Sequence, residues 1–319
     1  MRNMLVSILR PLLDTIYMIV PNYGWAVVIF TVLIRAVLLP LDIKSRSSMK
    51  RMSDLKPKLD ALNEKYANDQ EKLQRKTAEL YRKEKINPMS GCLPLLIQFP
   101  LLFGMLWTMQ AIASEQIVNM LQVLKDGGEP AMQSWLWVKN VFCSDTLFAA
   151  VIPISRDLTS LQVTSNVSQE LIDSLKEFVN TPSLYNPIMV KYGATVVEGI
   201  GNLMRSGKLP SWEILQVLNN PNGYYILPVL AAATQFLQTK INPAETAQTN
   251  ATPGKPNTMG IFMKYFFPLM SLWICCSSSA GFSIYWLTSN MIAILQSVFI
   301  NKSLNMKEAK NKSAQEISK

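Results

Sequence analysis

Long uninterrupted runs of apolar residues recur along the chain, and five of them approach the roughly 20 residues that a helix needs to cross a bilayer. The fourth run is short by itself, but Lys264 can extend its side chain to the interface and so lengthen it. A soluble core seldom carries five such runs, so the pattern predicts an all-α membrane protein with five transmembrane helices. The predicted spans are 23–41, 91–113, 223–241, 261–279 and 280–300.

Residues 1–22 carry a different pattern, in which polar positions share one side of a helix and Leu, Ile, Val and Met fill the rest. The polar positions are Asn3, Ser7, Arg10 and Asp14. They fall within roughly 60° of one another at the helical period. This distribution is typical of an amphipathic helix that lies in the membrane interface. A signal peptide is the rival interpretation, but Arg10, Pro11 and Asp14 interrupt its apolar region and no small-x-small cleavage site follows.

The segment 42–90 is predicted to form a hairpin of two helices. Apolar residues in its first half recur every three or four positions, which is helical spacing. They are Met49, Met52, Leu55, Leu59, Leu62 and Tyr66. Pro57 should kink or restart this helix, and Asn68 followed by Glu71 predicts the start of the second. The Met and Leu stripe is either the seam of the hairpin or an adaptable apolar surface for clients.

The region 114–222 contains signals of short helices between the second and third spans. Ser168 precedes a periodic apolar run that reaches Val179, as an N-cap residue would. Pro187 is predicted to open a second helix, and Ser211 to cap a third. We expect a helical insertion at about 145–221.

Charge then orients the chain. The mean hydropathy is +0.15 although 17% of residues are charged, so apolar and charged blocks alternate. The segment 42–90 holds 13 basic and 8 acidic residues, and the tail 301–319 holds 5 and 2. The positive-inside rule places both in the cytoplasm. Alternation of the spans then places 1–22 and 114–222 outside, and the loop 242–260 inside. The net charge of +9 is therefore mostly a sorting signal, and nucleic acid is a weak second interpretation.

The composition argues against an enzyme that makes or breaks covalent bonds. The chain has no histidine, which removes Ser-His and Cys-His dyads, His-bearing zinc sites and haem ligation by His. A Ser-Lys enzyme survives this test, although lysines are nearly absent from the spans. The four cysteines form no CxxC pair, so no metal or cofactor site is predicted. The last four spans contain no acidic residue to relay protons, which weakens ion-coupled transport.

Arg35 stands inside the first predicted span, about 9 Å before its cytoplasmic end. A central Arg costs roughly 2.5–3.5 kcal/mol on insertion scales, which implies a hydrated cavity or a buried partner. Snorkelling or a salt bridge inside the bundle is the plainer alternative. Polar residues of other spans, together with Thr31, suggest a hydrophilic groove, although each alone could simply join two helices. They are Gln98, Gln235, Gln238, Ser283, Trp286, Asn290 and Ser297.

Four strings in the sequence carry a family resemblance. They are TVLIRAVLLPL at 31–41, NPMSGCLPLLIQFP at 87–100, YYILP at 224–228 and GFSIYWLTSN at 281–290, with Gln296 beyond them. Their order and the charged hairpin between the first two resemble the YidC/Oxa/Alb family of membrane protein insertases. The lack of a large external domain after a first span resembles the Gram-positive type of bacterial member.

The resemblance implies a five-helix core around a hydrophilic groove that is open to the cytoplasm and lipid and closed outside. The family arginine, which attracts acidic or polar client tails, maps onto Arg35. The aromatic residue that faces the client maps onto Trp286, and a groove glutamine maps onto Gln238. The hairpin would recruit clients first, and transfer of the client's apolar segment into lipid would drive insertion without a nucleotide.

The resemblance also implies the setting. The expected location is the bacterial plasma membrane, with several spans, an external N-terminus and a cytoplasmic C-terminus. Expected partners are nascent membrane proteins, the ribosome through the basic tail and cytoplasmic loops, the lipid bilayer and the Sec translocon, with the chain itself a monomer. Two departures stand out: Ser279 replaces a usual Pro, and 145–221 replaces a usually short loop. A small-solute channel or transporter is the alternative function, and a membrane-bound enzyme is a weaker third.

Overall fold

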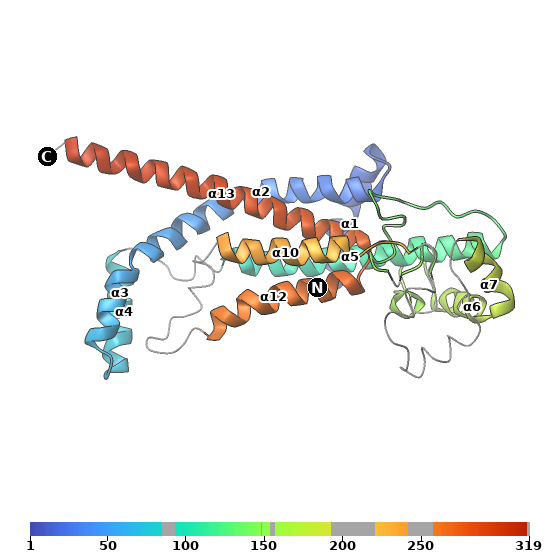
Figure 1. Cartoon of the computed structure of the whole chain (residues 1–319), viewed down its shortest axis with the longest axis horizontal. Coiled ribbons are helices and arrows are strands. Elements are labelled where there is room, and N and C mark those ends of the chain that lie inside the picture. The colour runs from blue at the N-terminus through green and yellow to red at the C-terminus, as the bar shows by residue number, and fades with distance from the viewer. Residues whose placement is uncertain (85–92, 148, 154–156, 193–220, 242–257, 318–319) are drawn as a thin grey trace. The chain divides into compact units, whose positions relative to one another are not determined.

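The computed structural model describes residues 1–84, 93–147, 149–153, 157–192, 221–241 and 258–317. Within these residues the protein is helical, and its only β structure is three isolated bridges (Figure 1). The helices are α1 (Arg2–Ile19), α2 (Tyr23–Asp54), α3 (Lys56–Lys65), α4 (Gln70–Lys83), α5 (Leu93–Lys125), α6 (Gln169–Asn180), α7 (Pro182–Lys191), α10 (Ile226–Ile241), α12 (Thr258–Ser277) and α13 (Ala280–Ile317). A short 3₁₀ helix covers Asp157–Ser160.

Five of these helices, α2, α5, α10, α12 and α13, overlie the five predicted spans. Among the described residues, two stretches are long and apolar enough to cross a membrane by length and composition alone. They are Tyr23–Met52 of α2 and Ala280–Ser303 of α13. Three helices run well past the predicted ends of their spans, because their polar extensions continue in helical conformation. α2 ends at Asp54, α5 at Lys125 and α13 at Ile317.

The chain divides into two compact units. The first contains Met1–Thr31, Leu102–Ala231 and Ser271–Thr288, and the second contains Val32–Leu101, Ala232–Met270 and Ser289–Lys319. The whole of α1, α6 and α7 belongs to the first unit, whereas α3 and α4 belong to the second. Each of the five long helices contributes residues to both.

The first unit has a tightly packed apolar core. Leu13 of α1, Phe30 of α2 and Met105, Met109 and Leu121 of α5 are at most 2% exposed. The start of α13 is fastened to the irregular segment that follows α5. There the amide groups of Ala280 and Gly281 donate to the carbonyl groups of Cys143 and Val141, at 2.8 and 2.9 Å.

In the first unit α1 buries Leu9 and Leu13 but leaves much of its apolar surface exposed. Ile8 is 54% exposed and Met18 is 82% exposed. Its charged residue Arg10 is instead only partly accessible and is engaged with another helix. An exposed apolar face is unfavourable in water, which fits a helix that contacts lipid.

The second unit contains the predicted hairpin, in which α3 and α4 lie side by side (Figure 1). Pro57 lies in the first turn of α3, so a new helix begins there after the end of α2, as predicted. The predicted first arm is not one helix, because residues 42–54 continue α2. The start of α4 was placed one residue too early. Asp69, not Asn68, is the N-cap, and its carboxylate accepts from the amide of Lys72 at 3.0 Å.

The predicted insertion contains α6 and α7, whose rings Phe178 and Tyr185 pack edge to face. Ser168 caps α6 as predicted, since its hydroxyl accepts from the amide of Leu171. The prediction for Pro187 is wrong: α7 begins at Pro182, because proline suits the first helical turn, and Pro187 lies inside the helix. The predicted cap Ser211 lies outside the described residues, as do Cys92 and most of the loop 242–260.

Candidate functional site

The Arg35 guanidinium lies buried in the second unit, with the residue only 8% exposed. Its Nε and one terminal nitrogen donate to the hydroxyl of Ser289 on α13, at 3.1 and 2.6 Å. The backbone carbonyl of Arg35 accepts a hydrogen bond from the side chain of Gln296 at 3.3 Å. Ser289 is neutral, so these hydrogen bonds orient the cation and partly satisfy its donors without cancelling its charge.

Three further predicted groove residues belong to the same unit. Asn290 on α13 donates to the hydroxyl of Thr234 on α10 at 3.4 Å, a contact that joins the two helices. Gln238 on α10 is half-buried, and its Oε1 has no hydrogen-bond partner among the described residues. Gln98 on α5 is also half-buried. Among its described residues, the second unit therefore holds a buried cation and several amide groups, and the Oε1 atoms of Gln238 and Gln296 are buried there without a hydrogen-bond partner.

Three other predicted groove residues belong to the first unit. Thr31 and Ser283 are buried, but their hydroxyls donate to backbone carbonyls of Val27 and Cys275. The Ser283 contact joins α13 to α12, which matches the plainer interpretation of a hydrogen bond between helices, whereas Thr31 bonds within its own helix α2. Trp286 is different, because it is 6% exposed and its Nε1 has no partner within the described chain.

The predicted client stripe is only partly available. Leu55 is 5% exposed, whereas Met52 and Leu59 are half-buried. The side chain of Met49 lies outside the described residues. The burial of Leu55 favours the seam interpretation for that residue and leaves Met52 and Leu59 as the accessible part of the stripe.

Sequence reasoning did not assign a role to Ser289 or Gln296, although both lie in or near the quoted strings. A signal was present for Ser289. It follows Trp286 by three positions and therefore shares the polar face that Ser283, Trp286 and Asn290 define. Nothing local links Gln296 to the backbone of Arg35, 261 positions away.

The connection that precedes α10 in the first unit is organised by Asp145, which was assigned no role from the sequence. Its carboxylate is 0% exposed and accepts from the amides of Tyr224 and Leu227 at 2.7 and 2.6 Å, across 79 and 82 positions. The second of these donors lies in the first turn of α10. Asp145 therefore acts as the N-cap of a distant helix, and its carboxylate satisfies backbone amides that have no partner within that helix.

Buried amides extend this connection. The Asn222 side chain accepts from the amide of Asn140 and donates to carbonyls of Asn140 and Ser144. The Asn140 side chain donates to the carbonyl of Val151 at 3.0 Å. The first residues of the predicted insertion are thus part of the packed first unit, because Asn140 before the insertion and Asn222 after it hydrogen-bond to the backbone at its start.

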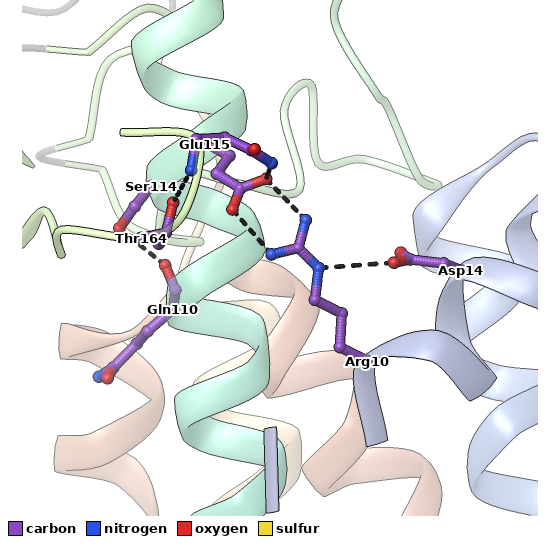
Figure 2. A network of polar contacts seen from close by, with 7 residues as sticks. Arg10, Asp14, Gln110, Ser114, Glu115 and Thr164 are labelled. Atoms are coloured by element: carbon purple, nitrogen blue, oxygen red, sulfur yellow. Dashed lines mark hydrogen bonds and ion pairs between the residues drawn. The ribbon is translucent and has the colours of Figure 1, made fainter. Parts of the chain in front are cut away.

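A second polar network ties α1 to α5 in the first unit. Figure 2 shows the Arg10 guanidinium facing the Glu115 carboxylate, with two parallel hydrogen bonds of 2.7 and 2.6 Å. On the other edge of the guanidinium, the Oδ2 of Asp14 lies 3.5 Å from the Nε of Arg10. Asn166 of the predicted insertion donates to the same Glu115 carboxylate at 3.2 Å. The hydrogen bond from Arg10, helped by its charge, holds the pKa of Glu115 below its ordinary value.

The described residues contain no group of three or more acidic, Cys or His residues arranged to hold a metal ion. The functional groups that the described residues present are therefore a buried cation, amide groups and apolar surfaces. These can attract and shield a polypeptide segment, whereas nothing among them forms a nucleophile–base pair.

Comparison with known proteins gives a consistent result. The family model described as 60Kd inner membrane protein matches residues 15–197 and 183–309. These ranges include 145–221, so the similarity extends further than the four sequence strings.

A "Membrane protein insertase YidC" of Fusobacterium nucleatum is 30% identical over 301 residues, which cover 94% of this chain and 96% of that protein. Proteins of the same name from Laribacter hongkongensis and Neisseria meningitidis are 28% and 27% identical. The chain spans only about 37% and 36% of the length of those two relatives. The family model matches most of the chain, and a relative that is covered over nearly its full length agrees with it. The chain therefore belongs to the 60Kd inner membrane protein family.

Proposed function

We propose that this protein is a membrane protein insertase and chaperone. It takes short nascent membrane proteins into a hydrated intramembrane groove and releases their apolar segments into lipid. The observation that carries the proposal is the buried Arg35 cation, oriented by a neutral hydroxyl. The names of the relatives support it, since they are insertases rather than enzymes.

The proposed groove contains Arg35, Thr31, Gln98, Gln238, Ser283, Trp286 and Asn290. A cation in a low-dielectric setting attracts an acidic client tail much more strongly than it would in water. The Oε1 of Gln238 and the Nε1 of Trp286, which have no hydrogen-bond partner among the described residues, add an acceptor and a donor for a polar client tail. Burial of the client's apolar segment in lipid then supplies the driving force.

The proposed topology has five spans in a bacterial plasma membrane, with α1 in the outer interface and α3 and α4 in the cytoplasm. The hairpin and the basic tail are the proposed contacts for the client and the ribosome. Cooperation with the Sec translocon and a monomeric state complete the proposal. The charge pattern supports this orientation, because the blocks with the greatest basic excess are 42–90 and 301–319.

The test is insertion of a short client with an acidic N-terminal tail into vesicles that contain the purified full chain. Arg35→Ala should reduce the inserted fraction about tenfold, which corresponds to about 1.4 kcal/mol. Arg35→Lys should reduce the inserted fraction less, because attraction of an acidic tail depends on the positive charge more than on the planar geometry of the guanidinium.

The matched control is Arg2→Ala, which removes an exposed arginine of α1 that belongs neither to the proposed groove nor to the hairpin. It should leave insertion unchanged. Equal insertion by wild-type protein and by a folded Arg35→Ala variant would refute the role of the cation. A vesicle that leaks small solutes only when the protein is present would instead favour a channel.

A further inference from the structure

A tight turn at 135–138 in the first unit exposes an apolar side chain. The amide of Trp135 donates to the carbonyl of Val138 at 2.8 Å, and the amide of Val138 donates to the carbonyl of Trp135 at 2.9 Å. Between them, Leu136 is 64% exposed and has a φ of +52°. This left-handed conformation favours glycine or asparagine and is unfavourable for a bulky side chain. An exposed leucine therefore occupies a position whose backbone disfavours it.

Hydrogen bonds hold this turn against the junction between α1 and α2. The side chain of Asn22 donates to the carbonyl of Ser134 at 2.8 Å. The side chain of Gln133 accepts from the amide of Tyr23 at 3.4 Å and donates to the hydroxyl of Tyr17 at 3.1 Å. Tyr17 belongs to α1 and Tyr23 to α2, so the turn is attached on both sides of the point where one helix gives way to the other.

Aromatic packing completes the attachment. The ring of Trp135 lies on Gly24, where the Cβ of any other residue would overlap it. The same ring packs edge to face with the rings of Trp25 and Trp137, at centroid distances of 5.7 and 6.2 Å. Trp25 is 48% exposed and Trp137 is half-buried. The three tryptophans and Leu136, which we call the junction cluster, therefore form a fixed and partly accessible apolar surface.

The setting of the junction cluster indicates what covers it. The stretch Tyr23–Met52, which begins at the cluster, is long and apolar enough to cross a membrane. On the other side, Met18 and Ile19 at the end of α1 are 82% and 77% exposed. In the topology of the proposed function, on which this step rests, α1 lies in the outer interface and α2 enters the bilayer there. Tryptophan is enriched at this level of a membrane.

The choice of residue at the tip also favours lipid over water. The segment 130–138 contains no charged residue. Glycine or asparagine at 136 would relieve the backbone but would offer no large apolar side chain. Transfer of an exposed leucine from water into an apolar environment is favourable and can offset an unfavourable φ. Contact with acyl chains therefore gives a physical reason for a leucine at this position.

We propose that the turn Trp135–Val138 is a membrane anchor. Leu136 inserts among the acyl chains of the outer leaflet, and the exposed edges of Trp25 and Trp137 lie at the level of the headgroups. Because the turn is attached to both helices, the anchor fixes the depth at which α1 meets α2.

The test uses the purified full chain in vesicles that contain a phospholipid with a photoactivatable diazirine in its acyl chain. After illumination, mass spectrometry of tryptic peptides locates the lipid adducts. In the peptide 126–139, adducts should lie on Leu136 and Trp137 several-fold more often than on residues 126–130 at its other end. Leu136→Asn suits a left-handed turn and should lose most of these adducts in a folded chain.

Residues 26–34 of α2 provide the internal control, since they should be labelled if this helix crosses the bilayer. Labelled α2 with an unlabelled turn would overturn this proposal alone, whereas labelling of neither would overturn the proposed topology and the anchor together. Unchanged labelling in a folded Leu136→Asn variant would show that Leu136 is not the inserted residue. If that variant does not fold, the labelling of the wild type decides. Arg35→Ala should leave the labelling unchanged, so failure of the insertase proposal remains distinguishable from failure of this one.

Discussion

Asp145 offers the sharpest test of how the first unit is held together. Its carboxylate is completely buried and caps the start of α10 through the amides of Tyr224 and Leu227. Tyr225, between these two residues, has a φ of +63°, a left-handed conformation that is unfavourable for a residue with a side chain. We expect the Asp145 hydrogen bonds to stabilise this turn, so removal of the carboxylate should release it.

The magnitude follows from the two backbone amide donors, although the Trp137 indole Nε1 also donates to this carboxylate at 3.4 Å. A hydrogen bond to a charged group contributes about 1.5–3 kcal/mol, and a buried donor left without a partner costs about 1–3 kcal/mol. The Leu227 amide is fully buried and the Tyr224 amide only partly, so the second can recover some hydration. Asp145→Ala should therefore lower the free energy of unfolding by about 2–4 kcal/mol. Asp145→Asn retains one acceptor oxygen and should cost about half as much.

The assay is equilibrium unfolding of the full chain in mixed micelles, followed by tryptophan fluorescence. Asp126→Asn serves as control, since surface substitutions of this kind change stability by less than about 0.5 kcal/mol. If Asp145→Asn and Asp145→Ala both match the control, the carboxylate does not hold the turn and the reasoning is refuted.

Two further predictions concern other charged residues. The pKa of Glu115 is lowered by Arg10, so this pair stabilises the folded state above the ordinary pKa of a glutamate, near 4.5, and loses its effect as the pH falls through the lowered value. Glu115→Gln should therefore lower the free energy of unfolding by about 1–3 kcal/mol at pH 7, but the difference should shrink as the pH falls below the ordinary pKa of a glutamate. A difference independent of pH would contradict this. Asp69→Ala should lower hairpin stability by about 1 kcal/mol through loss of the α4 cap, measured as faster amide exchange in α4, whereas equal exchange would show that the cap is dispensable.

The insertion shows how a local pattern can mislead about boundaries. Similarity of the flanking strings suggests that residues 145–221 could be replaced by a short linker without harm to the core. Asp145 and Pro221 stand at the edges of this segment, yet Asp145 caps α10 and Ala150 pairs with Pro221. A deletion that begins at 145 therefore removes a structural element of the first unit, and a test of the insertion must keep Asp145.

The sequence by itself determined the helical class and the approximate places of the long helices, but not every boundary, because apolar runs and 3.6-residue periodicity are local properties. It also located Arg35, since an isolated cation in an apolar run is visible without any partner. The N-cap of α6 at Ser168 was predicted correctly, because the cap and its helix are adjacent in sequence. The N-cap of α4 was predicted one residue too early, since Asp69 fills that position.

Only the tertiary structure decided which distant residues complete these local features. Ser289 meets Arg35 across 254 positions, Glu115 meets Arg10 across 105, and Asp145 caps a helix that begins about 80 positions later. A sequence pattern states that a buried charge or an exposed helix end needs a partner. Which partner fills that need depends on how helices pack, and many hydroxyl, carboxylate and amide groups along the chain could have met the same requirement.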